Sequence, residues 1–356
     1  MKVAYIACVG INSEAGVARK IFHQLMAWSK CGVDAQAFIV TGDTGDTANH
    51  FLKSLPVTII QHNNDKKSFF ASLRIAIITI RRWNPDIVYH RYFHYNTLLC
   101  RLFDDYRGIL EINTNDLSEY RLSMPRLKYL VHRVRRQWLF KRVRGFVAVT
   151  KEISRQLEAF DKPICVLANG IHIEDHQVLP APQHQKPALS FLGFPGYAWH
   201  GVDKIVRLAE TFKDWDFNII GYTPQDFASG VPSNVRLPGY LTEEQYLKIL
   251  LETDVAIGTL ALHRIGMQEA CPLKTREYLA RGIPAIIAYE DTDFPNETPF
   301  LLRLPNEENA VISHIDEIRQ FVEQWRGKRV NRKDIKHLDI NYKAQQQKDF
   351  FQKILK

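Results

Sequence analysis

Short apolar runs alternate along the chain with amphipathic segments whose apolar positions recur every three or four residues. The apolar runs predict strands over residues 3–9, 34–40, 57–61, 86–92, 109–113, 145–150, 164–170, 188–194, 217–222, 235–240, 254–260 and 284–289. The amphipathic segments predict helices over 17–32, 67–83, 96–106, 123–143, 151–160, 201–212, 243–253, 273–282, 314–325 and 342–356. Repeated strand–helix–strand units indicate parallel sheets with helices on both faces. The strands are continuously apolar, as strands covered on both sides must be.

One segment, 176–188, breaks this alternation because it is polar and contains three prolines. A chain of 356 residues also suits two domains better than one. We therefore expect an α/β protein with two Rossmann-like, doubly wound parallel-sheet domains, 1–170 and 171–341, and a central cleft between their loop-rich edges. The helix over 342–356 is a candidate to pack back on the first domain.

Composition narrows the class of protein. The chain is 46% hydrophobic and 24% charged, as soluble globular proteins are. Its first residues have the pattern of a buried strand rather than a signal peptide, and no run of about 18 uncharged apolar residues predicts a membrane span. The five cysteines form no CxxC pair, which favours reduced thiols in a cytoplasm over a disulfide framework or a zinc site.

The net charge of +8 comes from one segment. Residues 120–151 contain ten Lys or Arg and no acid, whereas the remainder carries 37 basic and 39 acidic residues. Apolar positions recur there at helical spacing, at Leu127, Leu130, Val131, Val134 and Trp138. A partner for such a helix is an anionic membrane surface bound through 121–144, with contacts from Arg133, Arg135 and Arg136. The alternative is a solvated helix that covers the N-terminal core; nucleic acid is disfavoured because no nucleic-acid module accompanies the patch.

Candidate chemistry lies in QEACPLKTREYLARGIPAII, residues 268–287. Glu269 precedes a helix that Pro272 is expected to begin, and Glu277 lies about a turn and a half inside it. The backbone N–H groups from Cys271 to Lys274 would be unpaired donors at a helix start, a ready anion site to which the Lys274 side chain adds a positive charge. Amide donors and a lysine for a diphosphate, with carboxylates for hydroxyl groups, together fit a nucleotide-sugar.

The same residues resemble the E-x7-E donor signature of retaining GT-B glycosyltransferases, in particular glycosyltransferase family 4. Further similarities follow in the family's order along nearly the whole chain: YHRY, LEINTND, LANGIH, FLGFPGYAWHGVDKIVRLAE, IIGYTP and VRLPGYLTEEQYLKILLETDVAI. The resemblance implies a GT-B fold with the acceptor bound by the N-terminal domain and the nucleotide-sugar donor by the C-terminal one.

The resemblance also implies roles for single residues. Glu277 would bind the donor ribose and Glu269 would lie near the transferred sugar. The further residues implied for the donor are Cys271, Pro272, Leu273, Gly221, Tyr222, Gly10 and Gly16. Acceptor candidates are Arg91, Asn113 and Asp116, with Glu111 beside them.

Two departures from the family pattern concern the leaving group. The family's donor-site Arg has no counterpart, since Phe194 or Pro195 stands there, and the Lys paired with it is replaced by His200. Stabilisation of the departing diphosphate would then be shared by His200 with Lys204 or Lys274. The histidine that many members carry in the N-terminal domain, near Asn115, is also absent.

The reaction implied is transfer of a sugar, with retention, to a lipid-linked or polysaccharide acceptor in cell-surface glycan synthesis, without a metal or other cofactor. The expected location is cytoplasmic, peripheral on the inner face of the plasma membrane. Asp291-Thr-Asp293 looks like a metal-binding DxD, but its late position in a Pro-rich loop disfavours that role. Alternatives are a nucleotide-sugar 2-epimerase of the same fold and a non-catalytic sugar-nucleotide or lipid-binding protein. A dehydrogenase is disfavoured because no GxGxxG follows a strand.

Each of these residues also has a purely structural interpretation. The two glutamates are also consistent with solvated surface positions, and His200 with an ordinary loop residue. The two N-terminal glycines are also consistent with a tight turn. His90, Arg91 and His94 are also consistent with a simple strand end, and Asn113 and Asp116 with turn formation.

Overall fold

A computed structural model describes residues 1–11, 16–43 and 56–356. The chain divides into two compact units. Unit 1 contains residues 1–172 and 339–356, and unit 2 contains residues 173–338. The change of unit at 172/173 lies beside the boundary expected at 170, and the last helix belongs to unit 1.

Unit 1 is built on a parallel sheet whose described strands have the order β3-β2-β1-β4-β5-β6-β7. The strands are β1 (Lys2–Cys8), β2 (Asp34–Thr41), β3 (Val57–Gln61), β4 (Ile87–Arg91), β5 (Arg107–Ile112), β6 (Gly145–Ala148) and β7 (Ile164–Val166). Because β1 pairs with both β2 and β4, the chain reverses direction across the sheet between β1 and β4. In doubly wound sheets, the carboxyl edge at such a switch point is where ligands bind.

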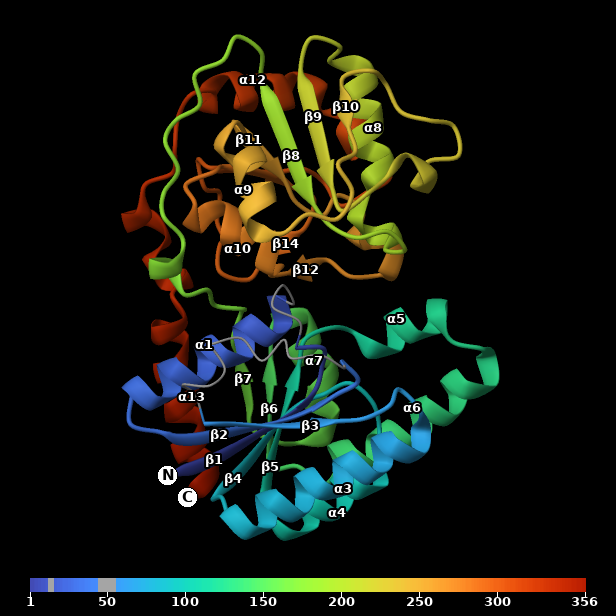
Figure 1. The fold of residues 1–356 in the computed structure, drawn as a ribbon, viewed down its shortest axis with the longest axis vertical. Helices are drawn as coiled ribbons and strands as arrows, with labels where there is room; N and C mark the ends of the chain where they lie inside the picture. Colours follow the sequence, from blue (N-terminus) through green and yellow to red (C-terminus); the bar gives the residue numbers. More distant parts are fainter. Residues whose placement is uncertain (12–15, 44–55) are drawn as a thin grey trace. The chain divides into compact units, whose positions relative to one another are not determined.

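Helices cover both faces of this sheet (Figure 1). On one face, α1 (Gly16–Lys30) packs against α13 (Ile340–Leu355), and Trp28 donates a 2.8 Å hydrogen bond to Gln347 within a buried aromatic cluster. The opposite face carries α3 (Lys66–Trp83) and α4 (Thr97–Asp105), which begin at the side-chain caps Asp65 and Asn96. Strand β6 is followed by α7 (Lys151–Leu157) and by η1 (Glu158–Phe160).

The helix expected over 123–143 corresponds to α6 (Arg126–Phe140), and a further helix, α5 (Asp116–Ser123), precedes it. Helix α5 ends at Met124, and α6 begins after Pro125. Proline cannot continue a helix from the preceding turn, so the chain breaks there. The apolar stripe of α6 faces outward, and its exposed members are Leu127, Leu130, Val131, Val134 and Trp138.

Unit 2 has a second parallel sheet, with described strands in the order β10-β9-β8-β11-β13-β15. They are β8 (Ala188–Leu192), β9 (Asp216–Ile220), β10 (Val235–Arg236), β11 (Val255–Ile257), β13 (Ala285–Ile287) and β15 (Leu301–Arg303). A separate pair, β12 (Glu269–Ala270) and β14 (Glu290–Asp291), lies beside it. The switch point of this sheet falls between β8 and β11.

The helices of unit 2 are α8 (Val202–Thr211), α9 (Glu243–Leu251), α10 (Leu273–Ala280), α11 (Ala310–Ser313) and α12 (Ile315–Trp325). Short 3-10 turns are η2 (Ile173–Asp175), η3 (Ala198–His200), η4 (Pro224–Asp226), η5 (Leu262–Ile265) and η6 (Arg332–Leu338). The apolar faces of α8 and α12 form one core with β8 and β9. Two doubly wound parallel sheets were expected, and that fold class is confirmed.

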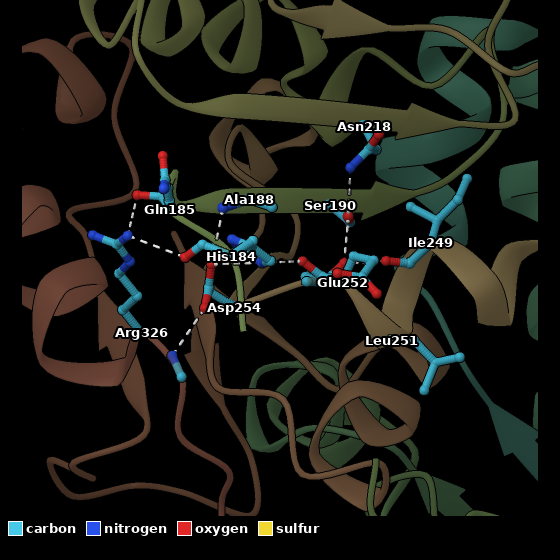
Figure 2. A network of polar contacts seen from close by, with 12 residues as sticks. His184, Gln185, Ala188, Ser190, Asn218, Ile249, Leu251, Glu252, Asp254 and Arg326 are labelled. Carbon is cyan, nitrogen blue, oxygen red and sulfur yellow. Dashed lines mark hydrogen bonds and ion pairs between the residues drawn. The ribbon is translucent and has the colours of Figure 1, made fainter. Parts of the chain in front are cut away.

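A polar network closes the amino end of the unit 2 sheet (Figure 2). Asp254, which is fully buried, accepts hydrogen bonds from the backbone N–H groups of Ala188 at 3.0 Å and Gly327 at 2.9 Å. Next to it, the hydroxyl groups of Ser190 and Thr253 are 2.6 Å apart. These bonds tie the starts of β8 and β11 together, so the opposite, carboxyl edge is left for ligand chemistry.

None of the described helices combines the length and hydropathy that crossing a lipid bilayer requires.

Candidate active site

The two carboxylates of the E-x7-E motif flank the start of α10. Glu269 is buried on β12, opposite Glu290 of β14. Pro272 is the N-cap residue of α10, and Leu273 is its first residue. The first backbone N–H groups of a helix have no acceptor within it, so the turn at Leu273 and Lys274 presents donors. Carboxylates and helix-start amides therefore come from one short stretch after β11.

Glu277 is held in a fixed orientation by two hydrogen bonds. The Tyr246 hydroxyl donates to Oε1 of Glu277 at 2.9 Å, and Nε of Arg281 donates to the same oxygen at 2.9 Å. Burial and the Glu277 charge raise the pKa of Tyr246, so this phenol keeps its proton. The described residues place no hydrogen bond on Oε2. Glu277 thus has one oriented oxygen for a ligand hydroxyl.

Arg281 also donates to Oε1 of Glu243 at 2.7 Å. Possible ligand atoms of His176, Glu243 and Glu277 lie within 4.8 Å of one another, a spacing that a metal ion could bridge. The guanidinium already supplies the positive charge between the two carboxylates, so the arrangement favours an ion-pair network over a metal site.

Lys274 supplies a buried cation at the same helix start. Its Nζ lies 4.0 Å from the centroid of the Phe191 ring and makes no hydrogen bond with any residue that the structure describes. Burial lowers the pKa of Lys274 to about 7. The side chain is therefore poised to be protonated and paired when an anion arrives.

His200 lies close to Lys274 and is a neutral imidazole. Burial, reinforced by the charge of Lys274, lowers the pKa of His200 to about 3. Its Nδ1 is 3.3 Å from the Tyr222 hydroxyl, which donates to the carbonyl of Phe194 at 2.6 Å. Of the two options for this residue, a protonated side chain and a neutral hydrogen-bonding one, the structure supports the second.

The loop that carries His200 is fixed against the neighbouring loop at the switch point. The backbone N–H of Leu260 donates to the carbonyl of His200 at 3.1 Å. Gly201 has a φ of +71°, and a Cβ there would come within 3.0 Å of Leu260. Gly221 has a φ of +92°, and a Cβ there would lie 1.8 Å from the carbonyl oxygen of Gly193. Only glycine fits at this close approach of the β8 and β9 loops.

Lys204 has a different environment from Lys274. It is buried on α8, and its Nζ donates to the carbonyl of Glu307 at 2.6 Å. Burial lowers the pKa of this side chain too. Lys204 thus has a protein partner, whereas Nζ of Lys274 makes no hydrogen bond with the described residues.

One important residue was missed from the sequence. Arg276 is completely buried and forms a bidentate pair with Asp291, at 2.6 and 2.7 Å, and a further contact with Asp293 at 3.1 Å. The DxD-like carboxylates are thus occupied by a guanidinium. Because Asp291 belongs to β14 and β14 pairs with β12, this bond also anchors Glu269. An arginine next to Glu277 on a helix looks like a surface residue, so only the nearby acidic pair could have hinted at its partner.

In unit 1, the residues from the switch-point strands gather at the carboxyl edge. Arg91 ends β4, and Asn113 directly follows β5. Gly10 precedes Ile11, whose backbone N–H donates to Asp43 at 2.6 Å, and Gly16 is the first residue of α1. Residues 12–15 of the expected donor loop lie outside the described residues.

Two candidate residues of this unit are buried and bonded to each other. Asp116, a candidate for acceptor binding, is buried and accepts two 2.9 Å hydrogen bonds from Arg136 and one of 2.7 Å from His132. Arg136, a candidate for membrane contact, is consequently buried, whereas Arg133 and Arg135 are exposed on α6. A carboxylate buried in the protein interior needs a partner, and α6 supplies the partners of Asp116.

Residues 15–175 match the model of Glycosyltransferase Family 4. No curated protein matches the sequence at a significant level.

Solved structures match over the length of both chains. Sucrose-phosphate synthase from Thermosynechococcus elongatus is similar with a TM-score of 0.74 and 12% identity, over 99% of this chain and 98% of that one. The lipopolysaccharide outer core galactosyltransferase WaaB, in its apo form, has a TM-score of 0.66 and 14% identity, over 99% and 100%. HepE from Anabaena, in complex with UDP and glucose, has a TM-score of 0.66 and 10% identity, over 99% and 100%.

The fold is therefore that of the GT-B glycosyltransferases, as the motifs predicted. The resemblance to glycosyltransferase family 4 is confirmed by the family-model match. Together they support a glycosyltransferase.

Proposed function

We propose that this protein is a retaining glycosyltransferase that moves a hexose from a nucleoside-diphosphate sugar to a lipid-linked or polysaccharide acceptor. The proposal rests on two side chains in the first turns of α10: a carboxylate in a fixed orientation and a buried ammonium group. Glu277 has Oε1 fixed by Tyr246 and Arg281, and Lys274 has no protein partner among the described residues. Similarity to HepE, whose structure contains UDP and glucose, supports a nucleotide-sugar donor.

The protein binds the donor through a negatively charged side chain at the ribose and a positively charged side chain at the diphosphate. Oε2 of Glu277 accepts a hydrogen bond from a ribose hydroxyl. Lys274 and the backbone N–H groups at Leu273 face the diphosphate, where the partial positive charge of the helix start adds to the ammonium. His200, as a neutral imidazole, contributes a hydrogen bond. The protein's own cation thus neutralises the leaving group, and we propose a metal-independent reaction.

In the transfer step, the acceptor hydroxyl oxygen forms a bond to the anomeric carbon as the bond from that carbon to the diphosphate oxygen breaks. The hydroxyl proton passes to the departing phosphate oxygen, on the face where the new bond forms. Glu269 then orients the transferred sugar through its hydroxyl groups. Lys274 contributes most when charge has developed on the leaving oxygen, which is where stabilisation accelerates a reaction.

Helix α6 supports a membrane-associated acceptor. Its exposed stripe includes Leu130 and Trp138, and Arg133 and Arg135 are exposed beside it. An exposed apolar stripe flanked by arginines suits the surface of a bilayer with anionic lipid. We place the protein at the cytoplasmic face of the plasma membrane, in the synthesis of a cell-surface glycan. A lipopolysaccharide galactosyltransferase shares the fold, which supports this class of acceptor.

An acceptor-dependent transfer assay tests the proposal. Purified protein is incubated with nucleotide-sugars and membrane lipid extract, and the products are analysed by mass spectrometry and by NMR of the anomeric proton. The proposal expects a sugar–lipid or sugar–glycan product with the donor's anomeric configuration. A 2-epimerase would instead change the free nucleotide-sugar without acceptor, and a binding protein would retain the donor without any product. Either result would overturn the assignment.

A further inference from the structure

Five polar side chains meet at the carboxyl edge of the unit 1 sheet, near the switch point between β1 and β4. Lys20 of α1 donates to Oε1 of Glu111 at 2.5 Å and to Oδ1 of Asn113 at 3.2 Å. The Tyr5 hydroxyl donates to the other carboxylate oxygen of Glu111 at 2.7 Å. Nη1 of Arg91 lies 3.7 Å from Oε1 of Glu111. The cluster is mostly buried and comes from three strands and a helix.

Among the described residues, the charges within this cluster do not balance. Burial by itself would raise the pKa of Glu111, but the cations of Lys20 and Arg91 outweigh it and lower that pKa to about 2. Glu111 is therefore ionised at neutral pH, and within the described part of the chain it is the one carboxylate that these two cations contact. Lys20 has the short contact with it, which leaves the positive charge of Arg91 in excess.

Two hydrogen-bond donors in the cluster also have no acceptor among the residues that the structure describes. Nη1 of Arg91 and Nδ2 of Asn113 are both buried and make no hydrogen bond within residues 1–11, 16–43 and 56–356. The 3.7 Å separation of Arg91 from Glu111 is beyond hydrogen-bonding distance. Lys20 holds the Asn113 amide by its oxygen, so the NH₂ group is directed elsewhere. Leaving a buried donor unsatisfied is unfavourable, and a ligand oxygen would supply the missing acceptor.

We propose that Arg91 and Asn113 form a subsite for an anionic group of the acceptor, a phosphate or a carboxylate. A neutral sugar hydroxyl could satisfy the Asn113 donor but would leave the excess charge of Arg91 uncompensated. An anion satisfies both, because a planar guanidinium and an adjacent amide can bind two oxygens of one group. The inference rests on the proposed function and narrows its acceptor to acidic or phosphorylated glycans.

Titration of three probes tests this subsite. Glucose 6-phosphate, glucuronate and glucose are titrated into the full-length protein saturated with UDP, so that the donor diphosphate site is filled. Binding is followed by calorimetry at low salt. We expect at least one of the two anions to bind and glucose to bind at least tenfold more weakly. Comparing glucose 6-phosphate with glucuronate shows whether the subsite binds a phosphate or a carboxylate.

Variants show whether the anion meets the proposed residues. Arg91→Gln and, separately, Asn113→Leu should each weaken the anion at least tenfold, whereas Arg82→Gln, an exposed arginine on α3, should bind it as the unaltered protein does. Melting temperatures of all variants are measured first. If Arg91→Gln does not fold, Asn113→Leu alone tests whether the anion binds at the subsite. Anion binding no stronger than that of glucose, or unaffected by both variants, would overturn the subsite.

Failure of the subsite and failure of the proposed function give different results. The titration is repeated without UDP in the Lys274→Met protein, whose diphosphate site has lost its cation. If UDP fails to bind the unaltered protein, the donor assignment falls, but anion binding that depends on Arg91 still supports the subsite. If UDP binds and neither anion does, the subsite falls and the donor assignment stands.

Discussion

The ammonium nitrogen of Lys274 lies 4.0 Å from the centroid of the Phe191 ring, in a place where the described residues offer it no hydrogen-bond acceptor. The ring face attracts a cation, but it does not replace the water that burial removes. Lys274 consequently loses its proton at a much lower pH than a lysine on the surface, with a pKa of about 7. A diphosphate would reverse this effect, because it favours the charged form.

This relationship predicts a pH-dependent affinity for nucleoside diphosphates. Well below pH 7, Lys274 is already protonated and no longer limits affinity for UDP, which then changes only as the terminal phosphate itself titrates near a pKa of about 6. Above about pH 7, the free protein must take up a proton to bind, and affinity should fall by at most tenfold per pH unit, the limit for one linked proton. Calorimetry in two buffers of different ionisation enthalpy at pH 8 measures the uptake directly.

Lys274→Met is the matched variant, and it should bind UDP weakly at every pH with no proton uptake. Lys248→Met, which removes an exposed lysine of α9, should behave as the unaltered protein. Proton uptake that persists in Lys274→Met would assign the titration to another group.

The buried Arg276–Asp291 pair predicts a large effect on stability. Arg276→Met leaves two carboxylates without their cation, and losing one partner of a buried pair costs about 3–5 kcal/mol. Because the two units need not unfold together, hydrogen exchange is measured on peptides covering 273–291. Arg236→Gln, an exposed arginine on β10, should change protection by less than about 0.5 kcal/mol. Equal protection in both variants would show that Arg276 does not anchor this segment.

Helix α6 predicts salt-sensitive binding to anionic vesicles. Each arginine near an anionic surface contributes about 1 kcal/mol, so the double variant Arg133→Gln with Arg135→Gln should bind phosphatidylglycerol vesicles about thirtyfold more weakly. The double variant Lys213→Gln with Arg236→Gln removes two exposed charges from unit 2 and serves as control. Sedimentation with vesicles measures both. If the two double variants sediment alike, α6 is not the membrane contact.

The sequence predicted most of the architecture because the apolar runs of buried parallel strands are local signals. It also placed Glu277 correctly within α10, since Pro272 marks the helix start. Two buried pairs, Arg276–Asp291 and Asp116–Arg136, were not predicted. Each joins residues from different elements, and nothing in the local pattern distinguishes a buried, paired arginine from an exposed one. The pairing is decided by how strands and helices meet in space.

The break between α5 and α6 is a different kind of error. The expected helix began at 123, before Pro125, whereas the proline ring and missing N–H separate α5 from α6, which begins at Arg126. Arg91 and Asn113 each have a donor without an acceptor among the described residues, and this could not be predicted, because a missing contact is a property of the folded site.

Calorimetric titration of UDP into the Glu277→Gln protein tests the central claim most directly, with Glu244→Gln as a control on the exposed side of α9. Loss of the charged acceptor for the ribose should weaken binding by about 2 kcal/mol, or about thirtyfold, while Glu244→Gln changes nothing. If Glu277→Gln folds and binds UDP as tightly as the unaltered protein, Glu277 does not hold the donor, and the site is not where we place it.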